Sequence, residues 1–364
     1  MERAVPIIAA GVLALLSSAA ITPVILLVSH RRAWFDIPNE RKIHTSPIPR
    51  LGGIGIFWGL MIATLAVPLL APVAFPGAWS TPYSLRFVPL FAGFCLLHAM
   101  GLVDDFHNLR ARLKFIVQLA AATLVTVGGF TISTVRIPGL GTYSLGLFSY
   151  PITVLWIVAI SNAINLVDGV DGLAGGISAF AALSLGLVSL VQGHPIPALF
   201  AFALLGAVIG FLAFNFPPAR IFMGDSGSLL LGCVLASLPL LATPGETSIS
   251  DLFAPATVLL IPILDTVSAV VRRVKGRRAI LSPDKEHIHH KLLALGWKET
   301  SILAIVYGFC LCFGVAAFGS MFLARGAALA LLGSVWVAAL IAFAVLNSAT
   351  RRSKLAAPDL QGRP

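Results

Sequence analysis

Long apolar runs, separated by short polar segments, follow one another along almost the whole chain. The longest reach about 20 residues, the length that an α-helix needs to cross the hydrocarbon of a bilayer. Charged residues make up only 11% of the sequence, against roughly 25% in a typical soluble domain. We therefore predict an all-α, polytopic integral membrane protein with about eleven transmembrane helices, at residues 5–28, 53–74, 87–103, 115–131, 150–164, 174–191, 197–214, 227–242, 253–271, 302–323 and 327–347.

The Lys and Arg residues indicate the orientation in the membrane. Of the 25, all but Arg3, Arg86, Arg136 and Arg325 fall on one predicted face. Because loops rich in Lys and Arg stay in the cytoplasm, we expect that face to be cytoplasmic, with the N-terminus outside and the C-terminus inside. The formal charge of +10 is distributed between spans and not gathered on a soluble face. The expected partner is therefore the lipid bilayer, and no nucleic acid.

The first apolar run and the four cysteines lead to two further predictions. The run is longer than the core of a signal peptide and only Arg3 is basic before it, so we expect a retained first span. All four cysteines lie inside apolar segments. Neither a disulfide framework nor a zinc site is expected from them.

The segment SNAINLVDGVDGLAGG contains Asp168 and Asp171, the only charged side chains of a long central stretch. A charge at the centre of a bilayer costs about 2.5–3.5 kcal/mol, so the two acids should lie at a membrane edge. There they would face a metal ion, a basic loop or a ligand. If this segment is helical, Asn162 and Asn165 lie on the same side as Asp168. A plain polar turn is the alternative, although it needs neither two acids nor two amides.

Two other polar segments lie earlier on the same predicted face. DIPNERKIHTSPIPRLGG contains three prolines and several cations, among them Arg50, where simple positive-inside anchoring is the alternative. GLVDDFHNLRARLK places Asp104 and Asp105 directly after a span and Lys114 further on. Adjacent carboxylates repel each other, so a cation or a metal ion is expected beside them. Salt bridges to the following basic residues are the alternative.

Two more polar segments follow in the second half of the chain. In RIFMGDSGS, Asp225 stands where a helix should start. It could be an N-cap, but the flanking glycines favour an open site with a free ligating carboxylate. The segment SPDKEHIHHKLLALG carries three histidines among basic residues and no cysteine, which argues against structural zinc. We interpret them as hydrogen-bond donors to a phosphate-rich ligand, with contact to anionic lipid headgroups as the alternative.

One acid, Asp265, falls inside a predicted span. An ionisable residue at that depth is a functional candidate, but an ion pair with a neighbouring basic residue explains it equally well. We therefore place it outside the predicted site.

One predicted face thus gathers five acids, two amides and many cations. Carboxylate and amide oxygens without cysteine suit a hard cation, Mg²⁺ first and Mn²⁺ as the alternative. Cations and a metal ion that face phosphates are typical of phosphoryl transfer, which depends on charge neutralisation and in-line positioning. The membrane setting implies that one reactant is a lipid.

These five segments, in this order from about residue 30 to residue 300, resemble the cytoplasmic motifs of the polyprenyl-phosphate N-acetylhexosamine-1-phosphate transferases, glycosyltransferase family 4. The sequences HIHH and PIPRLGG are more similar to the undecaprenyl-phosphate N-acetylglucosamine-1-phosphate transferases than to the phospho-N-acetylmuramoyl-pentapeptide transferases. The latter carry a triple-histidine run and a different first loop.

The resemblance implies transfer of a sugar 1-phosphate, N-acetylglucosamine 1-phosphate first, from a UDP-sugar to undecaprenyl phosphate, with release of UMP. This would be the first membrane step of cell-envelope polysaccharide synthesis, such as O-antigen or teichoic acid, on the cytoplasmic side of a bacterial inner membrane. Other donors stay open, namely UDP-N-acetylgalactosamine, a 6-deoxy-hexosamine or the muramoyl pentapeptide. A transporter of anionic lipid or nucleotide-sugar is the alternative of another class.

The resemblance also implies roles for single residues. Apart from the resemblance, we expect residues 1–350 to form one transmembrane catalytic domain, and the basic and then polar tail at residues 351–364 to be disordered in the cytoplasm. A homodimer stays open. The implied roles are lipid-phosphate activation for Asp104 or Asp105, phosphate binding for Lys114, metal binding for Asp225 and Asn165, and substrate binding for Arg50, Asn162, Asn165, Asp168, Asp171, His287, His289 and His290.

Overall fold

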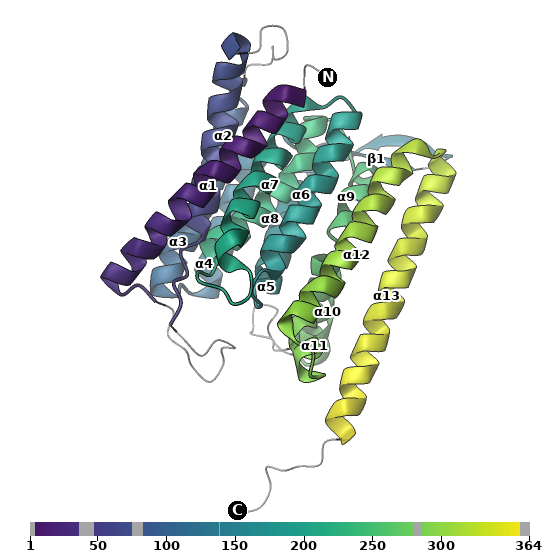
Figure 1. Ribbon diagram of the computed structural model, residues 1–364. Coiled ribbons are helices and arrows are strands. Elements are labelled where there is room, and N and C mark those ends of the chain that lie inside the picture. Colours follow the sequence, from purple (N-terminus) through teal and green to yellow (C-terminus); the bar gives the residue numbers. More distant parts are fainter. Residues whose placement is uncertain are drawn as a thin grey trace, which may run out of the picture.

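The computed structural model describes residues 4–35, 47–74, 83–137, 139–277, 279 and 286–356. Most of the first predicted cytoplasmic loop, with Arg41, Lys42 and His44, lies outside the described residues. The helices are α1 (Ala4–Arg32), α2 (Gly53–Ala74), α3 (Phe87–His107), α4 (Ala111–Val127), α5 (Ser149–Val167), α6 (Leu173–Val191), α7 (Pro195–Asn215), α8 (Asp225–Ala242), α9 (Phe253–Val258), α10 (Leu260–Lys275), α11 (Ile288–Ala294), α12 (Glu299–Gly319) and α13 (Arg325–Ala356) (Figure 1).

The prediction of a multi-pass, all-α membrane protein is confirmed. Among the described residues, nine helices are long and apolar enough to cross a membrane, and ten if α9 and α10 together form one span. The predicted number was about eleven. The difference arises at α4, whose 17 residues cover about 25 Å, less than the roughly 30 Å of bilayer hydrocarbon.

The helix predicted at 253–271 is not continuous, because α9 and α10 meet there at an angle of 97°. Leu259 separates them, and Pro262 lies in the first turn of α10. Proline has no N–H to continue the preceding helix, whereas it is tolerated in the first turn of a new one. Beyond the break, α10 packs against α5 and α13, and Asp265 is completely buried.

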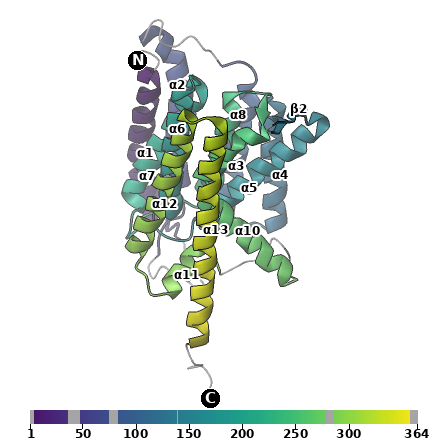
Figure 2. The ribbon, with the colours of Figure 1, turned by 90° about the vertical axis from the view of Figure 1, so that its right-hand side faces the viewer.

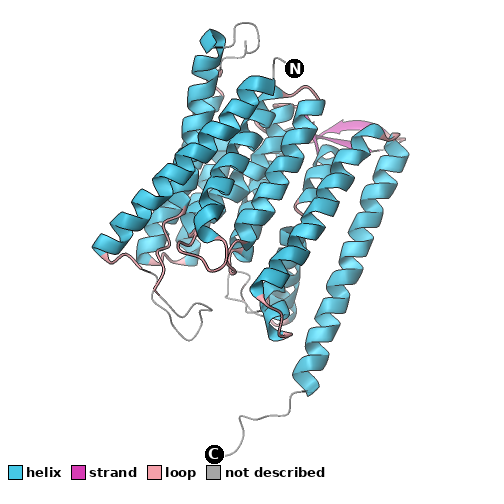
Figure 3. Cartoon of the chain, viewed as in Figure 1, coloured by secondary structure: helices cyan, strands magenta, loops and turns pink. Residues whose placement is uncertain are grey.

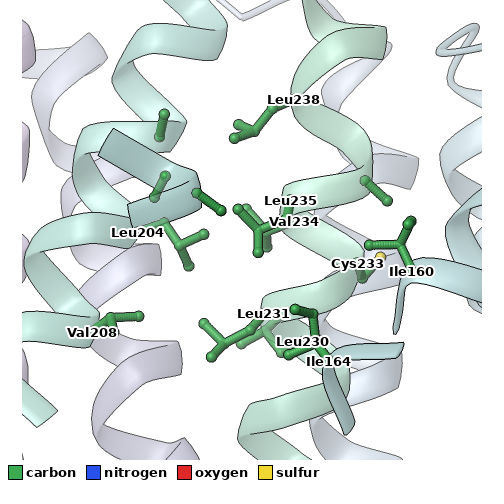
Figure 4. Close-up of a cluster of buried hydrophobic side chains, with 14 of the residues drawn as sticks. Ile160, Ile164, Leu204, Val208, Leu230, Leu231, Cys233, Val234, Leu235 and Leu238 are labelled. Atoms are coloured by element: carbon green, nitrogen blue, oxygen red, sulfur yellow. The ribbon is translucent and has the colours of Figure 1, made fainter. Parts of the chain in front are cut away.

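Helix α8 forms the centre of the bundle. Of the 18 residues of α8, 83% are buried inside the protein. In the 18-residue stretch of α13 that is apolar enough to cross a membrane, only 6% are buried. Figure 4 shows Leu231 and Leu235 of α8 between Leu204 of α7 and Ile160 of α5. The chain therefore surrounds α8, whose first residue is Asp225, with apolar helices on several sides.

Close helix packing depends on small residues at the contact between α1 and α7. A Cβ atom on Gly206 of α7 would collide with the backbone of Gly11 in α1. In a bilayer, helices associate through such close van der Waals packing of small residues. This contact holds the first helix against the core.

A small sheet caps one end of the bundle, with two strands from the connection between α4 and α5 and one from the connection between α8 and α9. Its strands are β1 (Ile132–Ile137), β2 (Gly141–Ser144) and β3 (Thr247–Ser248), in the order β2-β1-β3 (Figure 3). β1 pairs antiparallel with β2 and parallel with β3. The polar segments discussed above lie at the opposite helix ends.

The two ends of the described chain lie at opposite ends of the bundle. α1 begins beside the sheet end and α13 finishes at the far end (Figure 1). α13 continues to Ala356, into the segment predicted as a disordered tail, and residues 357–364 lie outside the described residues.

Candidate active site

The ammonium group of Lys114 lies between two carboxylates from different helices. Its Nζ donates to Oδ2 of Asp104 at 2.9 Å and to Oδ2 of Asp225 at 2.5 Å. The three residues come from α4, α3 and α8. Each is partly or largely shielded from solvent, with 24%, 6% and 14% of the side chain exposed for Lys114, Asp104 and Asp225. A convergence of two acids on one cation at the helix ends is the centre of the site.

The turn between α3 and α4 brings Lys114 back to Asp104. Asn108 ends α3 in the left-handed region, with φ of 48°, and its N–H donates to the Asp104 carbonyl. The Oδ1 atom of Asp104 accepts from the N–H of Leu109 at 2.7 Å. The acid thus fixes the turn with one oxygen and binds Lys114 with the other.

Asp105 caps α8 from another helix. Its Oδ1 accepts from the backbone N–H of Asp225 at 2.8 Å, and its Oδ2 from that of Ser226 at 3.2 Å. The free N–H groups of a first helical turn favour a carboxylate. Gly224 has φ of 73°, and a Cβ there would collide with Asp105 and with the Arg50 carbonyl. The alternative that Asp225 caps its own helix is therefore wrong.

With Asp105 as the cap, the side chain of Asp225 is left for the site. Its Oδ1 accepts from Nδ2 of Asn165 at 3.1 Å, and the same Nδ2 donates to Ser228 at 2.9 Å. Both contacts use the amide nitrogen of Asn165. Its Oδ1 accepts no hydrogen bond from the residues that the structure describes.

The end of the first loop pairs with the segment before Asp225. The N–H of Gly53 donates to Met223 O at 2.9 Å, and the N–H of Phe222 donates to Pro49 O at 2.8 Å. This pairing places Arg50 beside the site, although residues 36–46 of its loop lie outside the described residues.

Asp168 follows the last residue of α5 as its C-cap. Burial raises the pKa of its carboxyl to about 7, and the nearby carboxylate of Asp225 acts in the same direction, whereas the Arg50 guanidinium opposes both. Asp168 is therefore an acid whose charge depends on a cation being brought near it.

Asp171 links two loops. Its Oδ2 accepts from the N–H of Ala219 at 2.8 Å. Asn215 links the same two loops, because its Oδ1 accepts from the N–H of Gly172 and its Nδ2 donates to Ile221 O. The hydroxyl of Tyr307 donates to Gly172 O at 2.7 Å. The contact of Asp171 in the structure thus shapes the loop that carries Asp168.

The histidine segment docks on that same loop through α11. Asp265 accepts from His287, Nδ1 to Oδ2 at 2.8 Å, and from the N–H of Ile288 at 2.9 Å. The ring of His289 lies so close to Gly169 that a Cβ atom there would collide with it. Asp265, which we had placed outside the predicted site, therefore holds the start of the helix that carries these histidines.

His289 is neutral and has one open ring nitrogen. Burial, with the neighbouring His290 acting in the same direction, lowers the pKa of His289 to about 3. Its Nδ1 is buried and has no hydrogen-bond partner among the described residues. The ring of His290 packs against it, with centroids 4.3 Å apart. A buried nitrogen without a partner is costly, so it indicates a ligand position.

Asn162 lies one helical turn before Asn165, and its contacts differ. Its Nδ2 donates to Gln118 Oε1 at 2.6 Å and to the Val158 carbonyl. The bond to Gln118 ties α5 to α4, and the bond to Val158 lies within α5. The structure thus assembles Asp104, Asp225, Asn165 and Lys114, with Asn162 behind them.

Four residues in or behind the site were not singled out from the sequence as site residues. Gln118 and Asn215 are buried amides in apolar helices, a signal that the sequence shows. Tyr307 and Asp265 gain their roles only from helices that are distant along the chain.

The oxygen atoms at the site are of the kind that Mg²⁺ binds, namely the carboxylates of Asp104 and Asp225 and the amide of Asn165. Mg²⁺ uses one or two protein carboxylates and completes its shell with phosphate oxygens and water. Among the described residues no group of three or more His, Cys, Asp or Glu could by itself hold a metal ion. The acids of Asp104 and Asp225 nevertheless surround a positive charge already, that of Lys114.

Fold and site together define a multi-pass membrane transferase, and the comparisons with known proteins agree. The model of the family described as "Glycosyl transferase family 4" matches residues 87–243. The chain is similar to a probable undecaprenyl-phosphate N-acetylglucosaminyl 1-phosphate transferase of Bacillus subtilis, with 34% identity over 87% of this chain and 85% of the relative. It is 36% identical to a decaprenyl-phosphate N-acetylglucosaminephosphotransferase of Mycobacterium tuberculosis, over 89% of this chain and 85% of the relative.

A third relative is the undecaprenyl-phosphate alpha-N-acetylglucosaminyl 1-phosphate transferase of Escherichia coli, 28% identical over 77% of this chain and 74% of the relative. The chain belongs to glycosyl transferase family 4. The resemblance seen in the sequence is confirmed, and the protein is a transferase.

Proposed function

We propose that this protein transfers N-acetylglucosamine 1-phosphate from UDP-N-acetylglucosamine to undecaprenyl phosphate. The observation that carries the proposal is the convergence of Asp104 and Asp225 on Lys114 at the ends of membrane helices. The names of the relatives, which specify an undecaprenyl or decaprenyl phosphate and N-acetylglucosaminyl 1-phosphate transfer, support it.

The reaction exchanges one phosphorus–oxygen bond for another. An oxygen of the lipid phosphate attacks the phosphorus atom that carries the sugar, and the bond from that phosphorus to the bridging oxygen of the UDP-sugar breaks. UMP leaves with the bridging oxygen and the electron pair of the broken bond. One diphosphate is consumed and one is formed, so the free energies of substrates and products are similar.

The main barrier is electrostatic, because two anions must approach each other. A phosphate monoester has its second pKa near 6, so the lipid phosphate is mostly dianionic at neutral pH and needs little help from a base. Lys114 offers a fixed positive charge at the point where α3, α4 and α8 meet. Positioned positive charge is the main device by which proteins accelerate phosphoryl transfer.

Magnesium supplies, when bound, further positive charge to the phosphate oxygens, with Mn²⁺ as a substitute. Asp225 and the Oδ1 atom of Asn165 are the residues that would hold it, and Asp104 lies near enough to share Lys114 with Asp225. Asp168 and Arg50 lie beside this group, since the charges of Asp225 and Arg50 both act on the carboxyl of Asp168.

The twin acids have separate roles in this proposal. Asp104 holds Lys114 in place, and Asp105 holds the first turn of α8 so that Asp225 faces the site. Neither is needed to remove a proton. On the sugar side, the unpartnered Nδ1 of the neutral His289 is available for a hydrogen bond to a sugar hydroxyl or a diphosphate oxygen.

The proposed location is the bacterial inner membrane with the site on the cytoplasmic side. The support is the distribution of Lys and Arg, of which only Arg3, Arg86, Arg136 and Arg325 fall on the other predicted face. A cytoplasmic site also gives access to nucleotide-sugars, which are made inside the cell.

The deciding experiment is a UMP-release assay with the purified full chain in lipid nanodiscs that contain undecaprenyl phosphate. A panel of UDP-sugars, with N-acetylglucosamine, N-acetylgalactosamine, a 6-deoxy-hexosamine and muramoyl pentapeptide donors, is compared with and without EDTA. We expect fastest release from UDP-N-acetylglucosamine and loss of release in EDTA. Release from no donor, with uptake of labelled nucleotide-sugar into sealed vesicles, would instead establish the transporter alternative.

A further inference from the structure

A cavity of about 490 Å³ lies at the end of the bundle opposite Lys114. Its walls come from the last turns of α6, α8 and α12 and from the first turns of α9 and α13. The N-terminal end of α6 carries the loop of Asp171, and the cavity begins along this helix at Leu185, so about 12 residues, roughly 18 Å, separate the cavity from the acids. Its volume is within the range of small-molecule sites.

The cavity exists because α13 packs incompletely against the bundle. α13 runs along the side of the bundle next to α12 (Figures 1 and 2). Two polar contacts fasten it, from Trp336 Nε1 to Thr257 Oγ1 at 2.9 Å and from Lys291 Nζ to Asn347 Oδ1 at 2.5 Å. Both lie beyond the first two turns of α13, where Leu329 and Leu332 line the cavity instead of closing it.

The cavity has an apolar floor and a polar mouth. The floor contains Leu185, Leu238 and Leu332, all buried. An empty apolar space loses dispersion contacts on all its walls, and water is not stabilised where polar partners are lacking. Because the walls are membrane helices, the cavity is next to the bilayer, and a hydrocarbon chain of a bilayer lipid can occupy it.

The mouth carries an excess of positive charge. It includes two of the four basic residues of the predicted outer face, Arg136 and Arg325, and the acid Asp251. Arg136 is paired, with Nη1 3.6 Å from Oδ1 of Asp251. Arg325 makes no hydrogen bond or ion pair with any residue that the structure describes. One positive charge thus stays uncompensated at the entrance to an apolar space.

We propose that this cavity binds one anionic glycerophospholipid of the membrane. The phosphodiester group lies at Arg325, where an arginine can bind a phosphate through two N–H groups. One acyl chain occupies the floor between α13 and the bundle. A zwitterionic lipid fits less well, because its cationic headgroup brings a second positive charge to the mouth.

The test is native mass spectrometry of the delipidated full chain with equal concentrations of phosphatidylglycerol and phosphatidylcholine. We expect one phosphatidylglycerol to be retained about tenfold better than phosphatidylcholine, because both lipids offer a phosphodiester to Arg325 but only phosphatidylcholine adds a second positive charge at the mouth. R325Q should abolish this preference. R86Q, which removes another arginine of the same face outside the cavity, is the matched control and should keep it.

A second variant tests the floor. A328W places an indole ring in the cavity and should reduce retention of both lipids, while UMP release stays unchanged because Lys114 is at the other end of the bundle. Size-exclusion chromatography and the melting temperature show whether the variant folds. Equal retention of the two lipids by the unmodified chain, or an unchanged preference in R325Q, overturns the proposal. So does an A328W variant that folds and still retains phosphatidylglycerol fully.

Discussion

Asp105 and Asp225 lie 120 positions apart in the chain, and the carboxylate of the first binds the backbone N–H of the second at 2.8 Å. The contact makes one acid of the Asp-Asp pair a helix cap and leaves Asp225 free to face Lys114 and Asn165. The acid that faces the site is therefore oriented by an acid that does not.

The first prediction concerns that cap. Asp105→Asn replaces one acceptor oxygen by an amide N–H that faces another N–H, so we expect a loss of about 1–2 kcal/mol in the free energy of unfolding. Turnover should fall at every pH from 6 to 9, because α8 and with it Asp225 shift. Melting temperature and UMP release measure the two effects. A variant with unchanged stability but lost turnover would contradict a capping role.

The second prediction separates positioning from base catalysis at Asp104. Asp104→Asn removes a charged partner of Lys114, and we expect turnover to drop at least about tenfold with a flat pH profile. The lipid phosphate is already ionised, so raising the pH should not help. If turnover is abolished at neutral pH and returns at high pH with metal affinity unchanged, base catalysis is the better account.

The third prediction concerns Asp265. Asp265→Asn removes the charge that holds His287 and the start of α11, so His289 should lose its fixed place on Gly169. We expect the KM for the UDP-sugar to rise more than kcat falls. The matched control is Glu246→Gln, an exposed acid at the other end of the bundle, which should change neither constant. A fall in kcat alone would argue against a role in binding the sugar nucleotide.

The fourth prediction follows from Asp168. Its pKa is raised to about 7 in the folded protein, against about 3.9 in an unfolded chain. Between these values the folded state binds more protons, so the stability of the metal-free protein falls as the pH rises through 7. A bound Mg²⁺ should offset this loss. The increase in melting temperature on adding Mg²⁺ should thus be larger at pH 8 than at pH 6, and should lose this pH dependence in Asp168→Asn.

The fifth prediction uses the similar energies of substrates and products. Labelled UMP should appear in UDP-N-acetylglucosamine when the protein is incubated with that donor, undecaprenyl phosphate and Mg²⁺. The exchange should stop when the lipid is left out. Active protein that shows no exchange would falsify the direct transfer mechanism.

Much of this arrangement could be predicted from the sequence, because a chain so poor in charge must place its polar residues at helix ends. Asp104, Lys114, Asn165 and Asp225 were all expected on one face, and the structure brings them together. The number of spans was less accessible, since the length of α4 and the break before α10 depend on single residues such as Pro262.

Partners that are distant along the chain could not be predicted. The cap by Asp105 depends on how α3 packs against α8, where a Cβ atom on Gly101 would collide with Ser226. Asp265 had two equally good explanations until the break at Leu259 placed it against His287. In both cases the sequence pattern of one helix does not reveal where a helix distant along the chain packs against it.

The ammonium group of Lys114, held by two acids, gives the protein its own counter-ion. Newly made chains can therefore assemble these helix ends during insertion into the lipid, before any nucleotide or divalent ion arrives. At the proposed magnesium site, the same lysine would have to release part of its hold on the acids when the ion binds, so that loading the site would exchange one cation for another.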